Sequence, residues 1–287
     1  MKDRIFDCKK TGILAGIFAV LMITGSFFDY QISSMVFHET NPYAVFFAAY
    51  GEIPAFLCMC TAGTLLIKNA GNGHKIALFF SWFWGILLNL LALISAMFLP
   101  GKYMQMPQAV GILVGLLLVG GTDLLIWNMS EGAEHETIKK GILLFLLVPI
   151  IEILLINLIK IPWGRPRMRM IAVEEKAVFQ PWWIMGSDMK EQLTALGVAA
   201  EEFKSFPSGH TGNAACALLL GVLPVFCRKL QGKENLLFGL GLIFALLVGF
   251  SRVVAGAHFL TDTAVGLMLT CLTIEVLYHY IFKNDKK

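Results

Sequence analysis

Long apolar segments recur along the whole chain and limit the folds open to it. Apolar residues make up 57% of the 287 positions and charged residues only 15%, against about 25% charged in a typical soluble domain. A helix needs about 20 mostly apolar residues to cross a bilayer. Eight segments meet that length: 11–36, 43–67, 75–99, 107–128, 139–160, 209–227, 235–254 and 258–282. The sequence therefore predicts an all-α, polytopic membrane bundle of about eight transmembrane helices.

The positions of Lys and Arg predict how this bundle is oriented. With eight spans, both termini lie on one side, and that side carries 14 of the 23 basic residues: Lys2, Arg4, Lys9, Lys10, Lys68, Lys75, Lys139, Lys140, Arg228, Lys229, Lys233, Lys283, Lys286 and Lys287. The other side carries Lys102, Arg252 and a cluster between residues 160 and 204. Cytoplasmic loops are enriched in basic residues, so we expect cytoplasmic termini, and a first span that is an anchor because it lacks an A-x-A-like cleavage site. The cluster on the opposite side needs another explanation.

Three short segments at the ends of predicted spans supply that explanation. The first reads KIPWGRPR from Lys160 to Arg167, and the second reads PSGH and ends at His210. The third reads SRVVAGAHFLTD and ends at Asp262. All three lie on the predicted non-cytoplasmic side, so the membrane topology brings their polar side chains to one face.

The cations and small residues of these segments suit a phosphate group. Lys160, Arg167 and Arg252 provide three positive charges, and an Arg fork can hold two phosphate oxygens at once. Ser208 and Gly209 precede a predicted helix, where backbone N–H groups and the helix dipole favour an anion. We therefore expect these five residues to bind phosphate, with the serine hydroxyl as a further donor.

Two histidines and a carboxylate in the same segments suit phosphoryl transfer. His258 and Asp262 are spaced i, i+4, so on a helix they share a face. The carboxylate can then fix the tautomer of the imidazole and leave its other nitrogen free to attack phosphorus. His210 is the candidate general acid for the leaving oxygen and the later base for water. The sequence has no H-E-x-x-H motif, Asp-rich loop or paired Cys/His cluster that would indicate a metal site, so we expect no metal or other cofactor.

These segments resemble the three signature motifs of the type-2 phosphatidic acid phosphatase (PAP2) superfamily: K-x6-R-P, P-S-G-H and S-R-x5-H-x3-D. The second and third match in full, whereas Met168 stands where the first has proline. Arg165 is followed by Pro166, but taking that pair as the motif would put Leu158 at the lysine position. Arg167 is thus the motif arginine, and Arg165 is an additional candidate for phosphate binding. The resemblance implies a six-helix catalytic core over residues 71–287, with residues 1–70 as two additional transmembrane helices.

The same resemblance implies a metal-independent phosphatase that acts on a lipid phosphate or lipid diphosphate through a phosphohistidine. It implies His258 as nucleophile, His210 as acid and base, and Asp262 as the orienting group. We expect an integral protein of the plasma membrane, with an extracytoplasmic site, whose partners are the phosphorylated lipid and membrane lipids rather than nucleic acid. The number of subunits and the choice between mono- and diphosphate stay open.

Three alternatives remain open at this point. A soluble phosphomonoester such as glucose 6-phosphate would need the same chemistry. A non-catalytic lipid-phosphate-binding protein could use the same fold, although such relatives usually lose motif residues that this chain keeps. Vanadium-dependent haloperoxidases share the motifs but are typically not polytopic.

Other polar features carry weaker signals. Glu52, Asp123, Glu152 and Glu275 lie in or near predicted spans, where carboxylates are costly and serve either function or helix-to-helix hydrogen bonding. The segment 169–206 contains an aromatic run typical of a membrane interface and a short amphipathic stretch. It is either a lid over the site or a connector.

Overall fold

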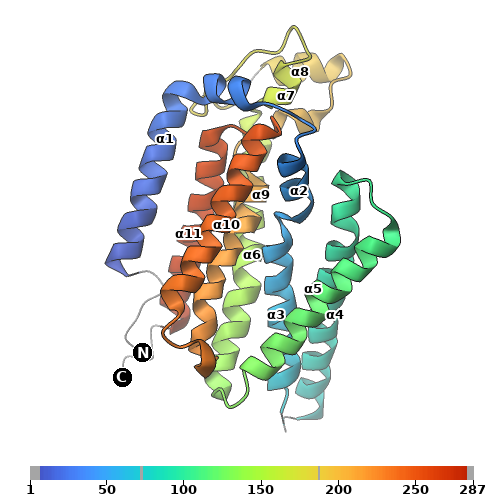
Figure 1. The fold of residues 1–287 in the computed structure, drawn as a ribbon, viewed down its shortest axis with the longest axis vertical. Helices are drawn as coiled ribbons and strands as arrows, with labels where there is room; N and C mark the ends of the chain where they lie inside the picture. Colours follow the sequence, from blue (N-terminus) through green and yellow to red (C-terminus); the bar gives the residue numbers. More distant parts are fainter. Residues whose placement is uncertain (1–6, 72–73, 187, 283–287) are drawn as a thin grey trace.

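The computed structural model describes residues 7–71, 74–186 and 188–282. Its long helices form an elongated bundle (Figure 1). In chain order they are α1 (Cys8–Val36), α2 (Pro42–Tyr50), α3 (Ile53–Asn69), α4 (Lys75–Tyr103), α5 (Gln108–Met129), α6 (His135–Trp163), α10 (Glu234–Val254) and α11 (Leu260–Phe282). Between α6 and α10 lie α7 (Met168–Ile171), α8 (Asp188–Ala195), η1 (Ala200–Phe203), α9 (Gly209–Ala215), η2 (Cys216–Val225) and η3 (Arg228–Leu230). The predicted all-α membrane bundle is confirmed.

Seven helical stretches in the described residues are long and apolar enough to cross a membrane. They match seven of the eight predicted spans, with ends that differ by a few residues. The remaining segment, Gly209–Val225, is shorter, because α9 ends at Ala215 and the chain continues as the 3₁₀ helix η2. A 3₁₀ helix rises about 2.0 Å per residue against about 1.5 Å in an α-helix, so this segment reaches further along the bundle than an α-helix of equal length.

The second predicted span is broken in the middle. Helix α2 ends at Tyr50, whose successor Gly51 still donates to the Phe47 carbonyl oxygen at 3.0 Å. Glu52 then occupies the N-cap position of α3 without a side-chain cap hydrogen bond, and Pro54 stands in the first turn of α3, where its missing N–H costs nothing. The break leaves Glu52 at the junction of two short helices instead of on the side of one long helix.

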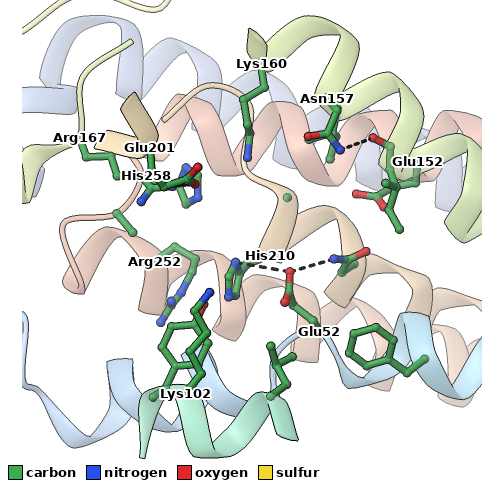
Figure 2. Close-up of a pocket in the computed structure, with 18 of the residues that line it drawn as sticks. Glu52, Lys102, Glu152, Asn157, Lys160, Arg167, Glu201, His210, Arg252 and His258 are labelled. Atoms are coloured by element: carbon green, nitrogen blue, oxygen red, sulfur yellow. Dashed lines mark hydrogen bonds and ion pairs between the residues drawn. The ribbon is translucent and has the colours of Figure 1, made fainter. Parts of the chain in front are cut away.

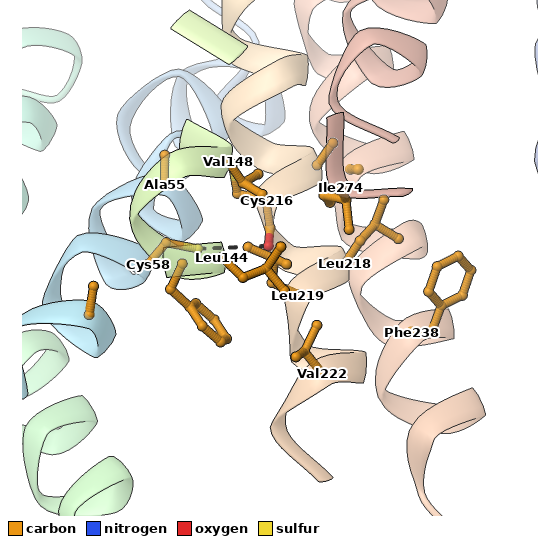
Figure 3. Close-up of a cluster of buried hydrophobic side chains, with 14 of the residues drawn as sticks. Ala55, Cys58, Leu144, Val148, Cys216, Leu218, Leu219, Val222, Phe238 and Ile274 are labelled. Atoms are coloured by element: carbon orange, nitrogen blue, oxygen red, sulfur yellow. Dashed lines mark hydrogen bonds between the residues drawn. The ribbon is translucent and has the colours of Figure 1, made fainter. Parts of the chain in front are cut away.

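The main core lies where α3, α6, η2, α10 and α11 meet. Leu144 and Val148 of α6 face Leu218 and Leu219 of η2, with Ile274 of α11 in the same cluster (Figure 3). These five side chains are all buried. By contrast, only 11% of the apolar window in α1, and likewise in α4, is buried. Most apolar side chains of these two helices face outward, where a bilayer would cover them.

The loops of the bundle gather at two opposite ends. The start of α1 and the end of α11 lie at one end, together with the α3–α4, α5–α6 and η2–α10 connections (Figure 1). Helices α7 and α8 lie at the other end, with the α1–α2 and α10–α11 connections. Gly164 ends α6 with a φ of +66°, a conformation that other residues adopt rarely. The chain therefore turns sharply there and carries the rest of the first motif across this end of the bundle.

Candidate active site

The three sequence motifs meet at the end of the bundle that carries α7 and α8. There the described residues enclose a cavity of about 650 Å³. Its wall includes Lys160 from α6, Arg167 before α7, His210 from α9, Arg252 from α10 and His258 from the α10–α11 turn (Figure 2). Five predicted site residues, spread over nearly a hundred positions, thus line one space.

Three cations surround one part of this cavity. Arg252 is buried, its Nη2 donates to the Ala44 carbonyl oxygen, and its Nε donates to Ser251 Oγ at 3.2 Å. Arg167 is also buried, and its Nη2 lies 2.9 Å from Glu201 Oε1. Lys160, in contrast, has no ion-pair partner among the residues that the structure describes. An anion that enters the cavity therefore meets two cations that form no ion pair among the described residues, Lys160 and Arg252, and competes with Glu201 for Arg167.

Gly209 and Ser208 hold different positions at the start of α9. Gly209 lines the cavity, and a Cβ added to it would lie 3.5 Å from Lys160 Nζ. Ser208 is fully buried, and its Oγ accepts hydrogen bonds from the backbone N–H and the hydroxyl of Thr211. Ser208 is absent from the described cavity wall. Its side chain caps α9, whereas Gly209 brings the backbone to the cavity wall beside Lys160.

His258 lies just before α11 and is held by a backbone carbonyl group. Its Nδ1 contacts the Ser205 carbonyl oxygen, while the distance from Nδ1 to Asp262 Oδ2 is 3.9 Å. The expected direct hydrogen bond to the carboxylate is therefore absent from this pair. A carbonyl oxygen can only accept, so Nδ1 carries the proton and Nε2 keeps its lone pair. Burial, followed by the nearby charges of Lys160 and Arg167, holds the pKa of His258 well below its ordinary value of 6.5, which favours the neutral imidazole.

Asp262 organises the loops around His258 instead of contacting its ring. Asp262 Oδ2 accepts from Ser205 Oγ at 2.5 Å and from the Phe259 backbone N–H at 2.7 Å. The same Ser205 supplies the carbonyl oxygen that contacts His258. Asp262 is thus linked to the imidazole through Ser205, and its orienting role stays a prediction.

Arg165 reaches Asp262 from the side away from the cavity. It is fully buried, its Nη1 donates to Asp262 Oδ1 and to Thr261 Oγ1, and its Nη2 donates to Asp29 Oδ2 at 2.9 Å. Its guanidinium carbon lies 4.3 Å from the centre of the Phe259 ring. Arg165 holds Asp262 and has no place in the described cavity wall, so its role as an additional phosphate-binding residue stays a prediction.

Asp29 brings α1 into this network. Asp29 is 3% exposed and also accepts from the backbone N–H and the hydroxyl of Thr261. The buried residues Gly25, Asp29 and Ser33 follow one another at a spacing of four, so they form one narrow stripe on α1. A Cβ on Gly25 would lie 2.6 Å from Thr261 Cγ2. Close packing through small and polar residues is typical of helix contacts in membranes.

His210 is paired with the carboxylate of Glu52, which lies at the break in the second predicted span. Its Nδ1 lies 3.6 Å from Glu52 Oε1, and the same oxygen accepts from Asn213 Nδ2 at 2.9 Å (Figure 2). His210 Nε2 has no hydrogen-bond partner. That nitrogen is therefore free to exchange a proton with a bound molecule.

Glu152 is a second carboxylate at the cavity. It is 1% exposed, and neither carboxylate oxygen has a hydrogen-bond partner. It packs closely against α9, since a Cβ on Gly212 would lie 2.0 Å from Glu152 Oε1. Asp123, by comparison, accepts hydrogen bonds from Thr64 and Cys60 of α3, so this carboxylate joins helices away from the cavity.

The sequence motifs gave no site role to Asp29, Ser205 or Glu201, and they left Glu52 between function and helix-to-helix hydrogen bonding. An aspartate within an otherwise apolar first span was the one available signal for Asp29. Ser205 acts mainly through its backbone carbonyl, which residue type does not reveal. Glu201 belongs to the segment 169–206, which was considered as a lid, and it lines the cavity. Part of that segment therefore forms the cavity wall.

Comparison with known proteins agrees with this geometry. The PAP2 superfamily model matches residues 141–286, about half of the chain. The chain belongs to the PAP2 superfamily. The resemblance in the three motifs is thereby confirmed, and all three lie within the matched range. Asp29 and Glu52 lie outside it.

A PAP2 relative adds one specific comparison. The chain is 40% identical over 72 residues to phosphatidylglycerophosphatase B of Bacillus subtilis (strain 168). That alignment covers 24% of this chain and 34% of the relative, so the chain matches about a third of the length of that protein. No solved structure matches the chain.

Proposed function

We propose that this protein is a membrane phosphatase that hydrolyses the phosphomonoester or diphosphate of a lipid through a phosphohistidine. The observation that carries the proposal is one cavity that combines three cations with two histidines of opposite role. His258 offers a free Nε2 as nucleophile, and His210 offers an unpartnered Nε2 as acid. Membership of the PAP2 superfamily and the phosphatidylglycerophosphatase relative support the same reaction.

The proposed reaction has two steps. First, His258 Nε2 forms a bond to phosphorus while the bond from phosphorus to the ester oxygen breaks, and that oxygen takes a proton from His210. Then water attacks the phosphohistidine, His210 accepts a proton from the water, and the P–N bond breaks to release phosphate. The sum is one monoester and one water converted to one alcohol and one phosphate, or one lipid diphosphate and one water converted to one lipid monophosphate and one phosphate. Lys160, Arg167 and Arg252 stabilise the charge on the transferring oxygens, which is the main source of catalysis in phosphoryl transfer.

The site is proposed to face away from the cytoplasm of the plasma membrane. The end of the bundle opposite the cavity carries Lys68, Lys75, Lys139 and Lys140 at helix ends and Lys229 in η3, in line with enrichment of basic residues on the cytoplasmic side. Lys2, Arg4 and the C-terminal lysines, which entered the same count, lie outside the described residues. The Lys and Arg residues at the cavity end are accounted for in part by phosphate binding.

The test is phosphate release by detergent-purified protein in the presence of EDTA. The panel contains phosphatidate, phosphatidylglycerol phosphate, undecaprenyl diphosphate and glucose 6-phosphate, with His258→Ala as the control. We expect release from a lipid substrate that EDTA does not reduce and that the variant abolishes. Acid-labile ³²P on the wild-type protein, absent from the variant, would identify the phosphohistidine.

Several outcomes would contradict parts of this proposal. Preference for glucose 6-phosphate would move the substrate to soluble esters, and binding without release from any member would favour a lipid-phosphate-binding protein. Loss of activity with EDTA would overturn metal independence. Hydrolysis of a membrane-impermeant substrate by inverted but not by right-side-out vesicles would reverse the orientation.

A further inference from the structure

The break between α2 and α3 places a carboxylate beside the proposed general acid. Glu52 stands between Tyr50, which ends α2, and Ile53, which begins α3. Its Oε1 lies 3.6 Å from His210 Nδ1, and its side chain is only 18% exposed. The pairing joins positions far apart in the chain, and Glu52 lies outside the segment that matches the PAP2 superfamily model.

We propose that Glu52 is a positioning residue that holds His210 in the orientation and the charge state that a general acid needs. The inference rests on the proposed function. With Nδ1 directed at Glu52, the ring presents its unpartnered Nε2 to the cavity. The carboxylate also stabilises the imidazolium form, since an opposite charge within about 4–6 Å favours the charged state.

The surroundings of His210 explain why this stabilisation is needed. The titratable and charged groups that share the cavity wall with it are Glu52, Lys102, Tyr103, Glu152, Lys160, Arg167, Arg169, Glu201, Arg252 and His258. Burial, and after it Arg252 and Lys160, oppose a positive charge on His210. Among the described residues, Glu52 is the acidic group within ion-pair distance of the ring. Without it, a protonated His210 would face two cations with no adjacent counter-charge.

Glu52 is itself held in place from the same helix as His210. Asn213 Nδ2 donates to Glu52 Oε1 at 2.9 Å, and Asn213 lies one turn after His210 on α9. The amide and the imidazole therefore converge on one carboxylate oxygen (Figure 2). A glutamine at position 52 could still accept from Asn213 but would not stabilise an imidazolium, which separates the charge from the packing.

The first experiment compares the pH profile of Glu52→Gln with that of the wild type. His210 must be protonated to act as an acid, so its titration sets the alkaline limb of activity. Loss of the carboxylate should move that limb to lower pH by about one unit or more, with a lower kcat at alkaline pH and little change in KM. Glu52→Asp should recover part of the shift. In a His210→Ala background, Glu52→Gln should have no further effect on kcat.

Asp123→Asn is the matched control. Asp123 is also a carboxylate hydrogen-bonded to α3, but it contacts Thr64 and Cys60 away from the cavity. Its neutral variant should leave the alkaline limb in place. An equal shift in both variants, or an unshifted limb in Glu52→Gln, would overturn the proposal.

A second readout does not depend on catalysis. Diethyl pyrocarbonate modifies neutral imidazole, so peptide mass spectrometry can follow the pH at which His210 becomes half reactive. That midpoint should be lower in Glu52→Gln than in the wild type, and equal midpoints would refute the pairing. If the midpoint shifts but the wild type releases no phosphate from any substrate, the proposed function fails while the pairing stands.

Discussion

The buried network around Arg165 makes a sharp prediction about stability. Arg165 pairs with both Asp29 and Asp262, and all three are shielded from solvent. In Asp29→Asn the amide oxygen can still accept from Thr261, but the charged bond to Arg165 is lost. A hydrogen bond to a charged group contributes about 1.5–3 kcal/mol, so we expect a loss of about 2 kcal/mol of unfolding free energy.

Arg165→Met should be more damaging than Asp29→Asn. It removes the single cation from between two carboxylates and leaves both buried without it. Breaking a buried pair in this way costs about 3–5 kcal/mol. At about 2 °C per kcal/mol for a chain of this size, the two variants should lower Tm by about 4 °C and by about 6–10 °C. The double variant should lose less than the sum, because both changes affect one network.

Thermal unfolding in detergent, followed with a thiol-reactive fluorophore, measures these shifts because the five described free cysteines are all buried. Glu191→Gln is the control, since Glu191 lies exposed on α8 and such surface changes stay within about 0.5 kcal/mol. Two results would refute the reasoning. One is a Tm for Asp29→Asn equal to that of the control, and the other is a smaller loss for Arg165→Met than for Asp29→Asn.

Two further predictions concern catalysis and packing. Burial and then Lys160 lower the pKa of His258, and the neutral ring is the proposed nucleophile. We therefore expect kcat/KM to persist below pH 6.5 and to fall only as the pH drops through the lowered pKa. Lys160→Met should move this acid limb to higher pH, and an unmoved limb would contradict the assignment. Gly212→Ala should lower Tm by several degrees, because its Cβ would overlap the Glu152 carboxylate. Gly239→Ala is the control, since a Cβ there meets open space. An unchanged Tm for Gly212→Ala would show that Glu152 is free to move.

The sequence by itself determined the fold class and predicted most of the residues that line the candidate site. Apolar length is a local property, and the bilayer imposes it directly on each span, so the spans could be read with ends accurate to a few residues. The motif residues His210, Arg252 and His258 could be predicted because phosphate chemistry needs particular residue types at fixed local spacing. Spans of alternating direction then placed the motifs on one face.

Tertiary structure decided how these residues are held. Arg165 pairs with Asp29 across 136 positions, and which carboxylate it meets depends on how α1 packs against α11. The Ser205 carbonyl oxygen contacts His258 because a loop passes beside it, and every residue carries such a carbonyl. Glu52 meets His210 because α3 packs against α9 in the bundle. Partners chosen by the packing of distant helices leave no local pattern in the sequence, so only the assembled bundle assigns them.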